Sequence, residues 1–150
     1  MREVQPLGIL SVLESQPAYA ERREEMSRQT GALGPDDRRR TAEYMRRGSV
    51  VLAIMEYTTD ILGTEFGVPG GSGILTDGEF YWRGDAADYV EHYGVTPGDD
   101  FLRRVAERHG VPPALTLDEI IDVDDYLSAM RRRPGPPRSI QPAPRKAPPW

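Results

Sequence analysis

The sequence lacks most of the residues on which metal and redox chemistry depend. Its 150 residues include no cysteine, which excludes disulfide bonds and thiolate metal sites, and only two histidines, His92 and His109. Lysine occurs once, at Lys146, so arginine supplies nearly all of the positive charge. A chain that combines arginine with many glycine, proline, alanine and aspartate residues is typical of a bacterial genome rich in G and C. The composition therefore indicates a bacterial protein that works without cysteine chemistry.

Long apolar runs are also missing. No stretch approaches the roughly 20 apolar residues that a membrane-spanning helix requires. Leu7–Leu13 is apolar and precedes Ala18-Tyr19-Ala20, which looks like a signal-peptidase site. However, Glu3 offsets Arg2, and polar residues precede the site, so a secretion signal is not favoured. We therefore expect a cytoplasmic protein without a membrane partner.

Charge is distributed unevenly along the chain. The last twenty residues hold six of the 19 basic residues and none of the 24 acidic ones, so residues 1–130 carry a net charge of −11. An acidic body attracts basic partners and repels nucleic acid. From Pro134 onward seven of seventeen residues are proline and few are aliphatic, which is typical of a disordered or polyproline-like segment. We predict a single α+β domain at 1–132 and a flexible, basic tail at 133–150.

The fold is predicted to centre on a β-hairpin at 73–82, where Asp77-Gly78 separates two short runs of aliphatic, β-branched and aromatic residues. Asp-Gly in this setting indicates a two-residue turn, which would pair Thr76 with Glu79. Side chains alternate along strands, so one face should be core and the other amphipathic. The expected core face holds Leu75, Phe80 and Trp82, and the opposite face holds Ile74, Thr76, Glu79 and Tyr81. The second face must be covered by a helix of this chain or by a partner.

Two further stretches precede the hairpin. Ser49–Tyr57 is the most continuous apolar run, and its length and β-branched start favour a central strand buried on both faces. Gly67–Gly73 is rich in glycine but lacks the Gly-Lys-Ser/Thr sequence of a phosphate loop. We interpret it as a flexible lead-in to the hairpin.

Helices are predicted from caps, glycine stops and the spacing of apolar residues. The segments are 15–30, 35–47, 86–93 after Asp85, a helix from Thr96-Pro97 to Gly110, and a helix from the capping box Thr116–Glu119 to about Met130. With the strands they predict an α+β fold, in which a small antiparallel sheet with the hairpin at 73–82 is packed by several helices.

Metal-binding and catalytic patterns are weak. His92 and His109 each lie shortly before a glycine that ends a predicted helix, where an imidazolium interacts favourably with the helix dipole. They are not spaced as a metal-binding pair, and no nucleophile elbow or calcium loop is present. We therefore predict no catalytic residue, no metal and no cofactor.

Carboxylates are plentiful, and this leaves one enzymatic alternative open. Asp77, Glu79, Asp85 and Asp88 lie close together in the sequence, and paired acids can catalyse hydrolysis. Each of these acids already has a structural explanation: Asp77 forms the turn, Asp85 caps a helix, Asp88 interacts with the helix dipole and Glu79 faces solvent. A hydrolase that uses Glu79 with Asp77 or Asp85 is the alternative.

One part of the sequence combines Thr76-Asp-Gly-Glu-Phe-Tyr-Trp82 with Tyr89-Val90 and Tyr93-Gly94-Val95, which follow it. These residues resemble a motif of small bacterial proteins, several of which look like immunity proteins of polymorphic-toxin systems. Gly48–Leu52 and Thr58–Leu62 are also similar to that group, so the resemblance covers roughly residues 40–105. It implies the same fold and a non-enzymatic inhibitor that occludes a toxin. The acidic body would suit a basic toxin domain.

We predict the interface with this protein partner at the end of the hairpin and the start of the next helix, at Glu79, Tyr81, Arg83, Asp85 and Asp88. A third hypothesis is a nucleic-acid-associated regulator that acts through the arginine-rich tail. The oligomeric state stays open.

Overall fold

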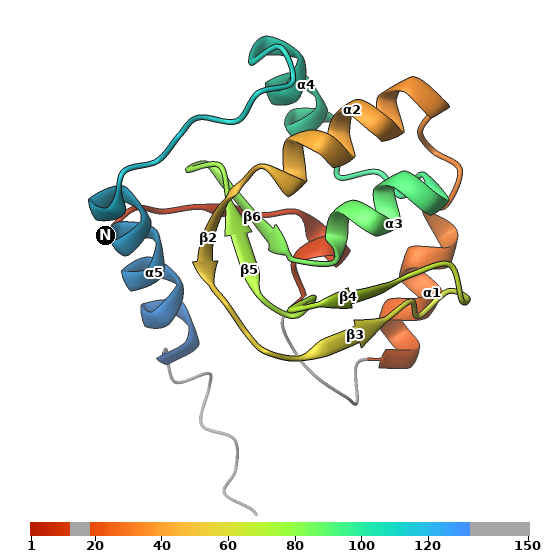
Figure 1. The fold of residues 1–150 in the computed structure, drawn as a ribbon, viewed down its shortest axis with the longest axis horizontal. Coiled ribbons are helices and arrows are strands. Elements are labelled where there is room, and N and C mark those ends of the chain that lie inside the picture. The colour runs from red at the N-terminus through yellow and green to blue at the C-terminus, as the bar shows by residue number, and fades with distance from the viewer. Residues whose placement is uncertain (13–18, 133–150) are drawn as a thin grey trace, which may run out of the picture.

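The computed structural model describes residues 1–12 and 19–132, which form an α+β fold with helices on both sides of a small sheet (Figure 1). The α-helices in these residues are α1 (Tyr19–Arg28), α2 (Pro35–Arg46), α3 (Ala86–Tyr93), α4 (Asp99–Glu107) and α5 (Leu117–Arg132), and the 3-10 helix η1 spans Gly8–Ser11. The predicted fold class is confirmed. The predicted tail at 133–150 lies outside the described residues, as does the predicted start of the first helix.

The strands form two sheets. The larger sheet has the order β1 (Gln5–Pro6), β6 (Phe80–Arg83), β5 (Ile74–Thr76) and β2 (Ser49–Leu52). β1 runs parallel to β6, whereas the β6–β5 and β5–β2 pairs are antiparallel. The smaller sheet pairs β3 (Tyr57–Thr59) with β4 (Gly67–Pro69) in antiparallel orientation. The larger sheet is therefore mixed rather than purely antiparallel, because the extended N-terminal segment joins it.

The predicted hairpin forms, but with a different register. Thr76 pairs with Tyr81 instead of Glu79, so the loop contains four residues rather than two. The carboxylate of Asp77 explains the wider loop, because its Oδ1 atom accepts hydrogen bonds from the backbone N–H groups of Glu79 at 3.0 Å and Phe80 at 2.8 Å. An aspartate side chain that bonds its own turn replaces the backbone pairing of a two-residue turn.

A register shift of two residues leaves the alternation of side chains unchanged, so both predicted faces are correct. On the core face, the ring of Trp82 lies 5.4 Å from that of Phe101, and its indole N–H donates to the carbonyl of Met45 at 3.2 Å. The opposite face packs against α5 through Val123 and Leu127. A helix of this chain therefore covers the second face. In Figure 1, α2 and α3 lie on one side of the sheet and α5 on the other.

The apolar run at 49–57 is not a central strand, and that prediction is wrong. β2 lies at the edge of the larger sheet and ends at Leu52, and the chain then crosses to the smaller sheet, which it enters at Tyr57. Consequently Val50 is 55%, Met55 104% and Tyr57 64% exposed. In the described part of the chain, β2 pairs with β5 on one side only. The β-branched residues of this segment correctly indicated a strand, but they did not show that the strand lies at the edge of the sheet.

Most helices begin and end close to the predicted residues, although not every predicted cap is made. Thr116 and Glu119 form the predicted capping box, with reciprocal hydrogen bonds of 3.1 and 3.2 Å. α4 is the exception, since it begins at Asp99 rather than at Thr96-Pro97. The Oγ1 atom of Thr96 accepts the N–H of Gly98 at 3.1 Å and forms a turn ahead of the helix. No helix in the described ranges is long and apolar enough to span a membrane.

Candidate functional site

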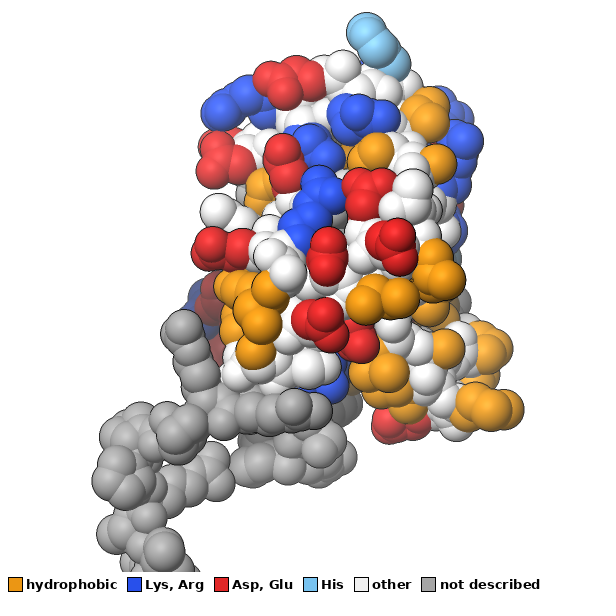
Figure 2. Space-filling model, turned by 90° about the vertical axis from the view of Figure 1, so that its left-hand side faces the viewer, with side chains coloured by type: hydrophobic (Ala, Val, Ile, Leu, Met, Phe, Trp, Pro, Cys, Tyr) orange, Lys and Arg blue, Asp and Glu red, His pale blue; other side chains and the backbone are white. Residues whose placement is uncertain are grey.

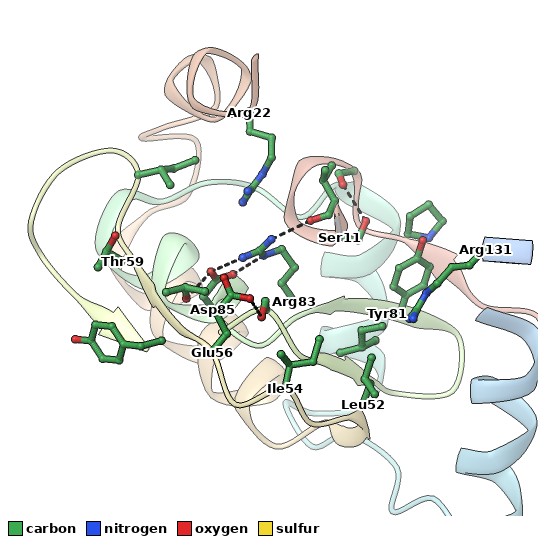
Figure 3. A pocket seen from close by; sticks show the side chains of 18 residues that line it. Ser11, Arg22, Leu52, Ile54, Glu56, Thr59, Tyr81, Arg83, Asp85 and Arg131 are labelled. Atoms are coloured by element: carbon green, nitrogen blue, oxygen red, sulfur yellow. Dashed lines mark hydrogen bonds and ion pairs between the residues drawn. The ribbon is translucent and has the colours of Figure 1, made fainter. Parts of the chain in front are cut away.

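A cavity of about 990 Å³ lies between β3, β6, η1 and α1, with the end of α5 at one side (Figure 3). Its apolar lining comes mainly from the β2–β3 segment and the hairpin and includes Leu52, Ile54, Ile74 and Tyr81. Its polar lining includes Ser11, Arg22, Glu56, Thr58, Arg83 and Asp85. The two sheets, the segment 6–12 and the end of α5 therefore meet at one hollow.

The centre of the polar lining is a buried ion pair. The Nε and Nη2 atoms of Arg83 each lie 3.0 Å from an oxygen of Asp85, and the two residues are only 7% and 2% exposed. The third guanidinium nitrogen donates to the carbonyl of Val12 at 3.2 Å, and the hydroxyl of Thr58 donates to Asp85 at 3.0 Å. This two-point pairing holds β3, β6 and η1 together. Both charges are therefore bonded inside the protein.

Asp85 precedes α3, as predicted, but its carboxylate makes no cap hydrogen bond and serves the ion pair instead. It reaches this position because the turn after β4 is built from glycine. A Cβ atom on Gly71 would lie 1.8 Å from the hydroxyl of Thr58 and 3.1 Å from the Cβ of Asp85. The N–H of Asp85 also donates to the carbonyl of Gly71 at 3.0 Å. The glycine-rich stretch predicted as a flexible lead-in instead forms β4 and a turn that packs against Thr58 and Asp85, where glycine permits this approach.

The rim of the cavity carries further polar groups. The exposed Glu56 accepts a hydrogen bond from the hydroxyl of Ser72 at 2.9 Å. Arg22 is 8% exposed and extends from α1 into the cavity, while Arg131 of α5 lies near Tyr81 (Figure 3). Burial raises the pKa of the Tyr81 hydroxyl. The rim therefore offers groups of both charge signs and hydroxyl donors.

The five residues predicted as a partner interface occupy three places. Tyr81, Arg83 and Asp85 are buried and line the cavity. Glu79 is exposed in the hairpin loop, and Asp88 lies half-buried on α3. A partner could reach the first three only through the cavity. Contact of these residues with a partner stays a prediction.

The hairpin loop forms a separate polar centre. The buried carboxylate of Asp77 accepts hydrogen bonds from the hydroxyl of Tyr44 and the Nε of Arg104, each at 2.7 Å. Burial, together with this carboxylate, raises the pKa of the Tyr44 hydroxyl. Arg104 also lies 3.1 Å from Glu79, so one arginine joins the two acids. Neither acid lines the cavity that contains Asp85.

One cluster has the composition of a metal site. Ligand atoms of Asp88, Glu91 and His92 all lie within 4.8 Å of one another. However, Arg46 bonds both carboxylates, at 3.1 Å for Asp88, and the ring of Phe66 stacks on the imidazole with centroids 5.3 Å apart. The guanidinium already provides the positive charge that these two acids attract. We assign no metal to this cluster.

The segments that carry the resemblance bond to one another. The Tyr93 hydroxyl donates to Asp60, whose other oxygen accepts the N–H of Leu62 at 2.8 Å. The Tyr89 hydroxyl accepts the N–H of Ile61 at 3.1 Å, and burial raises its pKa to about 12. These residues fix β3 and the loop after it against α3. Comparison of the chain with protein-family models, curated proteins and solved structures found no match.

Proposed function

We propose that the protein is a non-enzymatic, protein-binding module of the immunity type, which acts in the bacterial cytoplasm and holds part of a toxin in its cavity. The observation that carries this proposal is an open cavity whose central charges, Arg83 and Asp85, neutralise each other. An enzyme that worked through this pair would need one of the two charges to be free to act on a substrate. A binding module needs only a hollow of fixed shape.

Exposed apolar side chains beside the cavity support this function. Met55 and Tyr57, in the segment that forms one cavity wall, are 104% and 64% exposed. Large apolar side chains that gather on a surface mark interaction sites more often than isolated ones do. Aromatic residues and methionine are also enriched in protein interfaces.

The charge of the body indicates the kind of partner. Acidic side chains run down the face that carries α5, and hydrophobic side chains flank them in its lower half (Figure 2). Asp118, Asp122 and Asp125 of α5 are all exposed. A net charge of −11 over residues 1–130 attracts a basic protein, raises its association rate and makes that rate sensitive to salt. A basic toxin domain fits these properties.

The test is protection of bacterial cells that express toxin domains encoded beside this gene. The wild-type chain is expected to bind one of them and to restore growth. Thr59→Trp places a large ring in the cavity lining, and we expect it to weaken binding at least about tenfold. Thr64→Trp is the matched control, because Thr64 is also exposed but does not line the cavity.

Two outcomes would contradict the proposal. If no neighbouring toxin binds the chain or loses toxicity in its presence, the immunity function is wrong. If Thr59→Trp protects cells as well as Thr64→Trp does, the partner does not use the cavity.

A further inference from the structure

The hydrogen bonds between β3 and β4 show which way the backbone groups of β3 point. The N–H of Gly70 donates to the carbonyl of Glu56 at 2.8 Å, and the N–H of Asp60 donates to the carbonyl of Phe66 at 3.1 Å. In an antiparallel ladder, alternate residues bond to the same neighbour. Glu56, Thr58 and Asp60 therefore bond to β4. Tyr57 and Thr59 direct their backbone groups to the opposite side.

That opposite side faces the cavity. Tyr57 and Thr59 both line it, and among the described residues β3 pairs only with β4. The carbonyl of Thr59 lies 3.5 Å from the hydroxyl of Tyr89, which leaves both groups of Tyr57 and the N–H of Thr59 directed at the cavity. An unpaired strand edge is a template for another strand. Here the template lies inside a hollow of about 990 Å³ rather than on a flat surface.

We propose that the cavity binds an extended segment of the partner protein, which adds to β3 as a third strand through the backbone of Tyr57 and Thr59. This inference rests on the proposed function and specifies how the partner is held. Strand addition takes its affinity from main-chain hydrogen bonds and its specificity from alternate side chains.

The two faces of β3 define the side chains of this segment. Tyr57 and Thr59 share one face. The ring of Tyr57 lies over Gly67 of β4, so Thr59 is the residue beside an added strand, and its β-branched side chain favours a β-branched neighbour there. Thr58 and Glu56 share the other face, and the carboxylate of Glu56 is exposed there. A basic side chain complements it, in keeping with the acidic body. Asp85 neutralises Arg83, and the two other arginines of the lining, Arg22 and Arg131, come from α1 and α5, whereas Glu56 directly precedes β3 and lies beside an added strand. The occupant is therefore a segment that alternates apolar and basic residues.

The probe is the capped peptide Val-Arg-Val-Arg-Val, added at up to about millimolar concentration to the full ¹⁵N-labelled chain. Backbone amide shifts and hydrogen exchange are read by NMR. We expect downfield shifts and at least about tenfold slower exchange at the amides of Tyr57 and Thr59. The same peptide methylated on every backbone nitrogen keeps its side chains but loses its donors. It should bind at least about tenfold more weakly, and Val-Glu-Val-Glu-Val should bind more weakly than the arginine peptide.

Two variants separate the backbone from the side chain. Tyr57→Ala removes the ring but keeps the N–H, whereas Tyr57→Pro removes both, and proline is tolerated at a strand edge. We expect Tyr57→Pro to bind the peptide at least about fivefold more weakly than Tyr57→Ala. Unchanged shifts of β4 amides would show that each variant keeps the β3–β4 ladder.

Several results would overturn the proposal. One is the absence of shifts at Tyr57 and Thr59 with the arginine peptide, and another is equal binding of the methylated peptide. Slow exchange at these amides before peptide is added would mean that this chain already fills the edge, through its own residues or, if the protection depends on concentration, through a second copy. A toxin that binds the chain but leaves both amides unprotected would keep the immunity function and remove strand addition. If the peptide binds as expected but the chain protects cells from no toxin, strand addition is kept and the immunity function is removed.

Discussion

The hairpin end of the larger sheet and the β2–β3 segment, which leads to the smaller sheet, are packed very differently. At the hairpin end, Trp82, Tyr44 and Phe101 are at most 1% exposed and meet edge to face, and Asp77 is fully buried with its hydrogen bonds satisfied. At the β2–β3 end, apolar side chains face solvent and a strand edge faces a cavity. The same chain thus completes its packing at one end and leaves it incomplete at the other. A surface for a partner is expected where packing is incomplete.

The largest effect should come from the packed end. Trp82→Ala removes a fully buried ring and the hydrogen bond to Met45, and we expect it to lower the free energy of unfolding by about 3–5 kcal/mol. Urea denaturation followed by circular dichroism measures the change. A loss below about 1 kcal/mol would mean that the aromatic cluster is not the main core.

The ion pair at the cavity should respond almost as strongly to a single change. Asp85→Leu leaves the buried Arg83 without its carboxylate, which we expect to cost about 3–5 kcal/mol. The double variant with Arg83→Met removes both charges and should recover about 2 kcal/mol, because apolar pairs often replace buried ion pairs without loss. The same denaturation experiment applies. Equal stability of the single and double variants would contradict the role assigned to the pair.

Alkaline pH tests the contact between β3 and α3. The folded state raises the pKa of Tyr89 from 10.0 to about 12, so it favours the neutral hydroxyl. The resulting stabilisation is complete below pH 10 and is lost as pH rises toward 12. Tyr89→Phe should reduce this loss, as measured by the free energy of unfolding across that range. Tyr57→Phe is the control, because the ring of Tyr57 is exposed. If the free energy of unfolding depended on pH in the same way in Tyr57→Phe and Tyr89→Phe, the loss of stability could not be assigned to Tyr89.

A smaller effect is expected at the start of α5, which covers the hairpin's second face. Thr116→Ala removes the side-chain half of the capping box and should cost about 1 kcal/mol. Thermal unfolding monitors it. Thr64→Ala, in an exposed loop, provides the comparison and should leave the melting temperature almost unchanged.

The smallest effect should come from the open end. Met55→Ala deletes a fully exposed side chain, so the free energy of unfolding should change by less than about 0.5 kcal/mol. Binding of the partner should nevertheless weaken. A large loss of stability without a change in binding would reverse the comparison between the two ends.

Local features of the sequence predicted the helices well, because their ends depend on nearby residues. The capping box at Thr116 and Glu119 and the glycine at Gly94 set helix ends through contacts within a few positions. The faces of the hairpin were also predictable, since alternation survives a shift of two residues. Its register was not predictable, because it depends on Asp77, which is held by Tyr44 and Arg104 from distant parts of the chain.

The cavity could not be predicted for the same reason. Arg83 and Asp85 are neighbours in sequence, but their partners Thr58 and Val12 come from other elements. The one local signal was the glycine-rich stretch before the hairpin. A glycine in a sequence can indicate either flexibility or a close approach of two segments. Only the contact of Gly71 with Thr58 and Asp85 in the structure shows that it permits a close approach.

The pairing of β1 with β6 has a consequence for how the protein is made. Gln5 is synthesised 75 residues before Phe80, its parallel partner. At about 5–20 residues per second, the N-terminal strand waits about 4–15 seconds for the strand it joins. During synthesis this strand therefore cannot pair before β6 has emerged, and the hollow bordered by η1 is completed later still, because Arg131 of α5 also lines it.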